Sequence, residues 1–128
     1  MASQLDRIQS PHDVKSLSAE ELLDLAADLR AEMVAATALN GGHLASSLGA
    51  VELILAAYRV LDLPNDKLLF DVGHQAYAHK MMTGRLDGFA RLRHKGGVSG
   101  FTRREESCYD VHDSGHASDA LATAAGIA

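Results

Sequence analysis

Apolar residues recur on one face of a predicted helix between residues 19 and 38. Five of them have the three- and four-residue spacing of an amphipathic helix: Leu22, Leu25, Ala26, Leu29 and Met33. Ser18 and Glu21 precede this pattern with the spacing of a capping box, which marks the start of a helix. The Asn-Gly-Gly run at residues 40–42 tolerates the left-handed conformation that ends helices. The pattern therefore predicts a helix over residues 19–38, after a lead-in of residues 1–17.

A second apolar stretch extends from residue 47 to residue 61 and contains few polar positions. This pattern predicts a helix over residues 47–61 that is buried nearly all round. After a turn signal at Pro64, the short apolar run 68–70 is bounded by charged residues and predicts a buried strand. Shorter helical segments are predicted over residues 75–82, around residues 89–93 and over the alanine-rich stretch 120–128.

The predicted strand and helices together indicate an α/β fold that is helix-rich and contains the start of a parallel sheet. One strand cannot form a stable sheet, so partner strands are expected outside this chain. The last predicted helix also ends on apolar residues, without the basic side chains that favour a helix carboxyl terminus. We therefore expect residues 18–128 to form an incomplete domain.

The charge balance excludes two classes of partner. The chain of 128 residues has 12 Lys and Arg against 17 Asp and Glu, a formal net charge of −5 with its histidines neutral. Nucleic acids and anionic membranes require a surplus of basic side chains, so neither is an expected partner. Cys108 is the single cysteine, and the sequence has neither a secretory leader nor the ~18 apolar residues that span a membrane. These features predict a cytoplasmic location.

Histidines give the strongest indication of chemistry. His74 closes the run Asp-Val-Gly-His after the predicted strand, at the end where α/β sheets bind ligands. His116 follows the flexible Ser114 and Gly115 and precedes a predicted helix, so its imidazole and the free amides of that helix are predicted to bind one anion. Both patterns favour phosphate as the ligand. The alternative is that both histidines are hydrogen-bonded surface residues without a ligand.

Three other polar positions have weaker interpretations. Asp71 is a candidate base or metal ligand, although an aspartate at the end of a strand also caps turns. His79 lies inside a predicted helix, which favours a structural role. His112 and His116 are four residues apart, as in some metal sites, but Gly115 lies between them and a zinc site is disfavoured.

Four motifs, taken together and in this order, resemble one enzyme family. They are GGHLASSLG at residues 41–49, DVGHQAYAHK at 71–80, GGVSGF at 96–101 and SGHAS at 114–118. The chain is similar over nearly its whole length to 1-deoxy-D-xylulose-5-phosphate synthase, a family of thiamine-diphosphate-dependent, transketolase-like enzymes. The resemblance implies condensation of pyruvate with glyceraldehyde 3-phosphate and release of carbon dioxide. It also implies that residues 18–128 are the N-terminal part of a diphosphate-binding domain.

The resemblance assigns roles to particular residues. It implies that His74 and the run Gly115, His116 and Ala117 contact thiamine diphosphate, and that His43 faces the substrate. In such enzymes the cofactor performs the carbanion chemistry, while the protein supplies binding, orientation and proton donors. The chain departs from the family at Asp119, where small hydroxyl residues are usual. A carboxylate near a diphosphate repels it, so we expect this residue to weaken cofactor binding.

The family's Mg²⁺ motif and the glutamate that activates thiamine are absent from this sequence. We therefore expect the chain alone to be inactive. Three alternatives remain open: a subunit completed by a complementing chain, an inactive truncated product, and a non-catalytic binding module or relic that has lost cofactor binding. The resemblance implies a homodimer for the complete enzyme.

Overall fold

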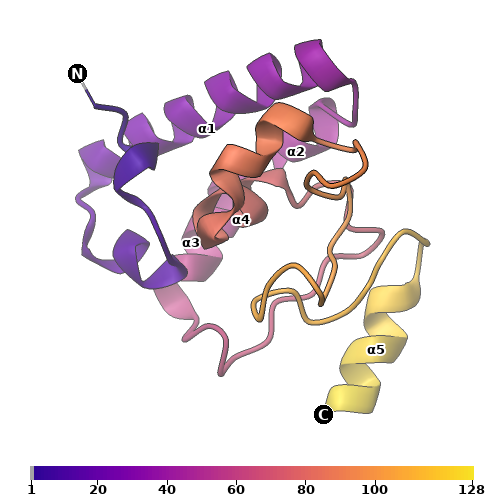
Figure 1. Ribbon diagram of the computed structural model, residues 1–128. Helices are drawn as coiled ribbons and strands as arrows, with labels where there is room; N and C mark the ends of the chain where they lie inside the picture. The colour runs from indigo at the N-terminus through magenta and orange to yellow at the C-terminus, as the bar shows by residue number, and fades with distance from the viewer. Residues whose placement is uncertain (1) are drawn as a thin grey trace.

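The computed structural model describes residues 2–128 of the chain. In chain order its helices are η1 Leu5–Arg7, η2 Pro11–Ser16, α1 Ala19–Asn40, α2 Ala45–Gly49, α3 Val51–Val60, α4 Tyr77–Lys80, η3 Met81–Arg85, η4 Leu86–Arg91 and α5 Asp119–Ile127. Figure 1 shows α1 lying across the group of shorter helices, with α5 set apart at the other end of the molecule. The long segment between η4 and α5 is irregular and connects these two parts.

Helix α1 confirms the predicted helix and its start. The Ser18 hydroxyl accepts a hydrogen bond from the Glu21 amide at 3.2 Å, and the Glu21 carboxylate accepts one from the Ser18 amide at 2.8 Å. The helix continues two residues beyond the predicted range and ends at Gly41, whose φ of +73° suits glycine. Its buried face consists of Leu25, Ala26, Leu29, Met33 and Ala36.

The predicted helix over 47–61 forms as two helices, α2 and α3, with a break at Ala50, where φ is −93° and ψ is −6°. The expectation of burial all round is wrong. Helix α3 packs against α1 and η2 on one side, whereas its Leu53 and Val60 side chains are 74% and 81% exposed. An apolar sequence alone could not distinguish these faces, because most of its residues are apolar on both sides.

The predicted strand at residues 68–70 is not formed, and residues 2–128 contain no strand. A strand requires a neighbouring strand for its backbone hydrogen bonds, and these residues find none within the described chain. The segment is instead irregular, and Phe70 is buried with its ring 5.1 Å from that of His79. The start of a parallel sheet is therefore corrected to a helix-rich arrangement.

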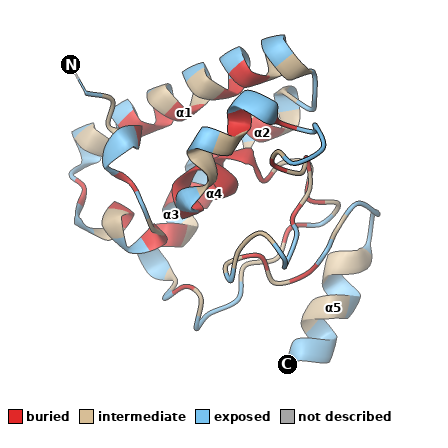
Figure 2. Ribbon diagram, in the orientation of Figure 1, coloured by how far each residue is buried: buried red, intermediate tan, exposed pale blue. Residues whose placement is uncertain are grey.

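The remaining elements agree with the predicted segments in kind but differ in extent. The helix predicted over 75–82 is α4 followed by the π-type turn η3, the turn predicted at 89–93 is the earlier 3₁₀ helix η4, and the helix predicted over 120–128 is α5. None of residues 119–127 is buried. The lead-in also folds onto the core, because Leu5, Ile8 and Val14 are buried in the cluster shared by α1, α3 and α4 (Figure 2). None of the described helices has the length and apolar character that crossing a membrane requires.

Candidate functional site

Three of the four sequence motifs meet at two histidine rings. The His43 and His74 rings are 5.2 Å apart, measured between centroids, and lie edge to face at 78°. The Phe101 ring lies 6.2 Å from that of His43, tilted at 56°. His43 is exposed and His74 is half-buried. The fold thus brings together residues from the motifs at 41–49, 71–80 and 96–101, including the predicted site residues His43 and His74.

Two buried side chains hold these histidine loops in place. The Tyr77 hydroxyl accepts a hydrogen bond from the His43 amide at 3.4 Å, and the Ser47 hydroxyl donates one to the His74 carbonyl at 3.1 Å. A Cβ atom at Gly42 would lie only 2.7 Å from the Tyr77 hydroxyl, so glycine permits this close approach. Sequence reasoning did not single out Tyr77 or Ser47, although both lie inside the quoted motifs.

Backbone strain is concentrated around the same loops. Val72, Arg93 and Ser118 are the non-glycine residues with positive φ among residues 2–128, at +63°, +65° and +71°. A β-branched residue such as Val72 is a genuine outlier in this region, and strained residues cluster at binding and catalytic sites. The strain therefore supports the assignment of the turn at 71–74 as part of a functional site.

Gly73 is the point at which the fourth motif joins the others. A Cβ atom there would lie 3.1 Å from the Ser114 Cβ and 3.2 Å from the Thr102 amide nitrogen. The Ser114 amide also donates to the Thr102 carbonyl at 3.2 Å. The exposed residues Gly115, His116 and Ala117 follow directly. They therefore begin beside the turn that carries His74.

The His74 Nδ1 atom is buried and has no hydrogen-bond partner within residues 2–128. Buried polar atoms are nearly always hydrogen-bonded, so an unpartnered imidazole nitrogen at a strained turn is an indication of a ligand. The neighbouring Thr102 hydroxyl is also buried and also has no hydrogen-bond partner among the described residues.

We expect Gly73→Ala to destabilise the chain by about 1–3 kcal/mol, because it forces a side chain into the left-handed region and against Thr102 and Ser114. Urea denaturation followed by circular dichroism measures this change. Gly126→Ala is the matched control, because a Cβ atom at Gly126 meets nothing within 4 Å and its φ is not positive. Equal midpoints for the two variants would contradict the packing described at Gly73.

The predicted anion site at the start of α5 requires a correction. The Asp71 carboxylate accepts hydrogen bonds from the Ser118 amide at 3.1 Å and the Ala120 amide at 3.2 Å. These backbone bonds hold the pKa of Asp71 below its usual value. Asp71 therefore caps a helix 47 residues away in the chain, and these two amides are not free to bind an anion beside His116.

Asp119 is also engaged within the chain. Its carboxylate accepts a hydrogen bond from the Ser114 hydroxyl at 3.2 Å and lies 3.5 Å from His112 Nε2. No cluster of three His, Cys, Asp or Glu side chains able to hold a metal ion occurs among the residues that the structure describes. The zinc alternative based on His112 and His116 therefore gains no support.

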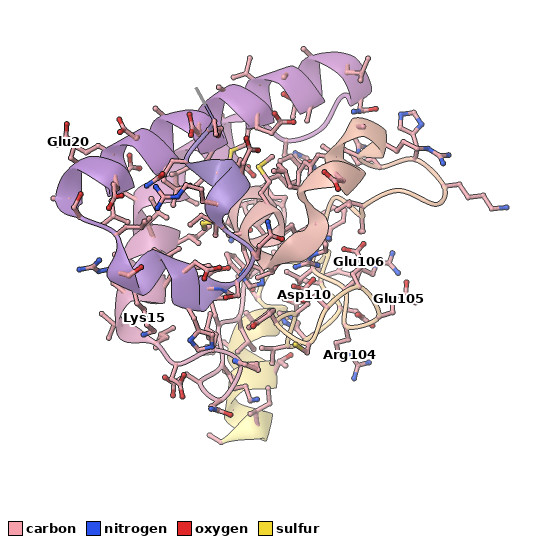
Figure 3. The ribbon with its side chains drawn as sticks, turned by 60° about the vertical axis from the view of Figure 1, so that its left-hand side comes forward. Lys15, Glu20, Arg104, Glu105, Glu106 and Asp110 are labelled. Atoms are coloured by element: carbon pink, nitrogen blue, oxygen red, sulfur yellow. The ribbon has the colours of Figure 1, made fainter. Side chains whose placement is uncertain are left out.

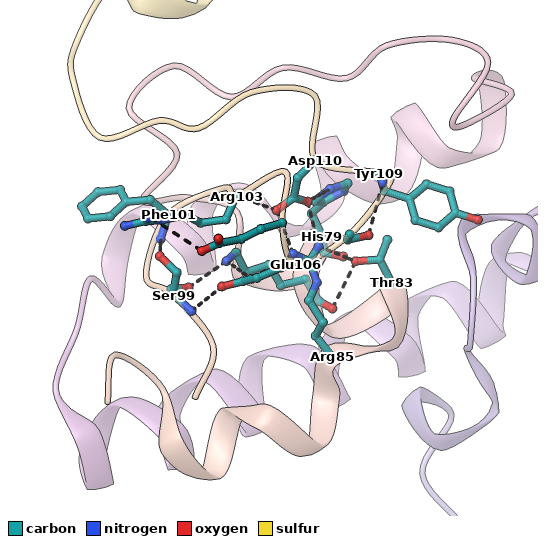
Figure 4. Close-up of polar contacts among 12 residues, drawn as sticks. His79, Thr83, Arg85, Ser99, Phe101, Arg103, Glu106, Tyr109 and Asp110 are labelled. Carbon is teal, nitrogen blue, oxygen red and sulfur yellow. Dashed lines mark hydrogen bonds and ion pairs between the residues drawn. The ribbon is translucent and has the colours of Figure 1, made fainter. Parts of the chain in front are cut away.

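A buried polar network surrounds His79 (Figure 4). His79 Nδ1 is 2.6 Å from the Tyr58 hydroxyl, and His79 Nε2 is 3.0 Å from the Asp110 carboxylate. Arg85 forms two hydrogen bonds with the same carboxylate, at 2.7 and 2.8 Å. The expected structural role of His79 agrees with its complete burial. Tyr58, Arg85 and Asp110 were not identified from the sequence.

The directions of the pKa shifts in the network indicate which of its groups carry a proton. Burial lowers the pKa of His79, and Arg85 and Lys80 lower it further, although Asp110 opposes this change. Burial alone would raise the pKa of Asp110, but hydrogen bonds from Arg85, His79 and the Arg103 amide hold it well below its usual range. Asp110 is thus ionised and accepts the Nε2 proton of a neutral His79, whose Nδ1 accepts the Tyr58 hydroxyl proton.

These pKa directions predict a pH dependence of stability. Because the pKa of folded His79 is below its usual 6.5, the unfolded chain binds the proton more readily, and stability falls as the pH decreases below about 6.5. We expect the urea midpoint to fall between about pH 7.5 and about pH 5.5 more steeply than in His79→Gln, whose amide does not titrate. Equal slopes would show that His79 does not contribute.

Comparisons with known proteins identify the family that the sequence resembles. A family model described as 1-deoxy-D-xylulose-5-phosphate synthase matches residues 5–128. A protein of that name from Thermus thermophilus is 61% identical over 123 residues, which are 96% of this chain and 20% of the relative. The 1-deoxy-D-xylulose-5-phosphate synthase 1 of Geobacter metallireducens is 55% identical, and the Dehalococcoides mccartyi synthase is 54% identical, each over 100% of this chain and 20% of the relative.

The chain therefore spans about a fifth of the length of the curated relatives that it matches. The similarity covers all four motifs and the buried network, since the matched range extends from residue 5 to residue 128. The chain belongs to the 1-deoxy-D-xylulose-5-phosphate synthase family.

Proposed function

We propose that this chain supplies a thiamine-diphosphate-contacting surface and a substrate-facing histidine to 1-deoxy-D-xylulose-5-phosphate synthesis. The observation that carries the proposal is the pairing of His43 with His74, whose buried Nδ1 atom has no partner among the described residues. The substrates of the complete enzyme would be pyruvate and glyceraldehyde 3-phosphate. The complete enzyme is proposed to be a homodimer, and a complementing chain is the proposed partner if the synthase is divided.

The residues at the site fit the organic cofactor. The unpartnered His74 nitrogen and the exposed His116 imidazole are available to bind it, and the exposed backbone of Gly115 and Ala117 lies beside the latter. Thiamine diphosphate, when bound, supplies a thiazolium that stabilises a carbanion. His43 is exposed next to His74, so its imidazole nitrogens are accessible to a substrate as a hydrogen-bond donor and acceptor.

The same residues do not fit Mg²⁺. Two carboxylates beside the fourth motif, those of Asp71 and Asp119, already accept hydrogen bonds from amides at the start of α5 and from Ser114. A Mg²⁺ ion requires several oxygen ligands in near-octahedral order, and the described residues gather no cluster of three candidate ligands. We therefore propose that the chain alone does not release carbon dioxide from pyruvate.

Imidazole resonances of the 128-residue chain test cofactor binding. Adding thiamine diphosphate is expected to shift the nuclear magnetic resonance signals of His43, His74 and His116. His74→Ala is expected to weaken the affinity about tenfold, the effect of losing one hydrogen bond to a charged ligand. The matched control is His12→Ala, because His12 is an exposed histidine on η2. Unchanged histidine signals in the presence of the cofactor would contradict the proposal.

One observation favours a second candidate function, a non-catalytic binding module or relic. The Asp71 carboxylate lies at the α5 amides beside the fourth motif, where it competes with a phosphate group. This alternative predicts a cooperative thermal transition that thiamine diphosphate does not move. Asp71→Asn distinguishes the two, because removing the charge is expected to strengthen cofactor binding if the surface retains it.

A further inference from the structure

Glu106 joins three segments of the chain at one carboxylate. Its Oε1 atom accepts a hydrogen bond from the Ser99 amide at 2.7 Å, and its Oε2 atom accepts one from Lys80 Nζ at 2.7 Å and one from Arg85 at 3.1 Å. Lys80 Nζ also donates to the Ser99 carbonyl at 2.8 Å. Both backbone polar groups of Ser99 are therefore tied to a single ion pair.

Ser99 in turn contacts Phe101, whose ring lies beside that of His43. The Ser99 hydroxyl accepts a hydrogen bond from the Phe101 amide at 3.2 Å, and the Phe101 ring lies 6.2 Å from that of His43. The surrounding loop contains Gly96, Gly97 and Gly100, which have the most conformational freedom to lose on folding. The loop therefore depends on external contacts to keep one conformation.

The ion pair is buried in a way that stability alone does not explain. The Lys80 side chain is fully buried and that of Glu106 is 18% exposed. Removing such charges from water costs about as much as their attraction returns, so a buried ion pair is weak evidence for stability and can instead fix one arrangement. The groups that this pair fixes are the two backbone groups of Ser99.

We propose that Glu106 is a positioning residue that, through Ser99, holds Phe101 against the His43 imidazole. The inference rests on the proposed function, in which His43 faces the substrate. Phe101 then limits the orientations of the imidazole, whose ring lies 6.2 Å from that of Phe101 and 5.2 Å from that of His74. Lys80 and Arg85 share the role, because both bind the carboxylate oxygen that does not contact the Ser99 amide.

The test uses the ligand-free 128-residue chain, so that it does not depend on cofactor binding. In Glu106→Gln an NH₂ group replaces one carboxylate oxygen, so the side chain can no longer accept hydrogen bonds from both Lys80 and the Ser99 amide. We therefore expect the nuclear Overhauser cross-peak between the Phe101 and His43 ring protons to be lost. Glu105→Gln is the matched control, because the Glu105 side chain is 80% exposed (Figure 3). Phe101→Leu is expected to move the His43 ring signals in the same direction as Glu106→Gln.

Ser99→Ala separates positioning from general destabilisation. It removes the hydroxyl that accepts the Phe101 amide while leaving the ion pair intact, and we expect it to reduce the same cross-peak without changing the α1 amide signals. A cross-peak of normal intensity in both Glu106→Gln and Ser99→Ala would overturn the proposal. If the unsubstituted chain does not bind thiamine diphosphate but the variants lose the cross-peak as expected, the proposed function is contradicted and the positioning role stands.

Discussion

Replacing Asp110 with alanine is expected to lower the free energy of unfolding by about 3–5 kcal/mol. The carboxylate is fully buried and bonds Arg85 twice, His79 Nε2 at 3.0 Å and the Arg103 amide at 2.8 Å. Its removal leaves the Arg85 guanidinium, whose side chain is 9% exposed, with one carboxylate partner fewer. It also leaves the buried His79 N–H without an acceptor. A domain of this size has a total stability of about 5–15 kcal/mol, so the loss is a large fraction of it.

Urea denaturation at neutral pH measures this loss through the helical circular dichroism signal. The matched control is Asp113→Ala, whose carboxylate is 51% exposed and lies 3.5 Å from Arg104. We expect the control to lose no more than about 1 kcal/mol, because solvent screens exposed ion pairs. If Asp110→Ala and Asp113→Ala had the same midpoint, the buried network would not stabilise the fold.

The sequence predicted those parts of the fold that local interactions determine. Ser18 and Glu21 act within a few residues of the start of α1, so its start was correctly placed, whereas its end lies two residues beyond the predicted one, next to Gly41. The strand at 68–70 was wrong because strands depend on partners elsewhere, which a short apolar run does not reveal. The break at Ala50 follows Gly49, a residue of low helix propensity that the apolar pattern on both sides outweighed in the prediction.

The candidate site was predicted in its residues but not in its geometry. The motifs identified His43 and His74, yet the edge-to-face contact between them follows only from the fold. Asp71 was interpreted near its own turn, whereas it bonds amides 47 residues away. Lys80 and Glu106 escaped detection because charged residues are mostly exposed, so a lysine in a short helix is interpreted as surface.

Replacing Tyr77 with alanine is the second substitution with a large expected effect, a loss of about 3–5 kcal/mol. Tyr77 is fully buried, and its ring packs edge to face on Phe89 with centroids 5.7 Å apart. Alanine leaves a cavity beneath the loop that carries His43, because the Tyr77 hydroxyl is the group that contacts Gly42 and the His43 amide. The urea midpoint gives the stability change, and the His43 ring signals report the release of the loop.

Tyr77→Phe separates the two roles of this side chain. Phenylalanine keeps the packing on Phe89 and removes only the hydroxyl, so we expect the free energy of unfolding to change by no more than about 1 kcal/mol. The His43 amide should nevertheless exchange its hydrogen with solvent faster, because its acceptor at 3.4 Å is lost. Unchanged exchange in Tyr77→Phe would mean that the ring alone supports the loop. A faster rate would instead assign to one hydroxyl the link between the hydrophobic core and the histidine proposed to face the substrate.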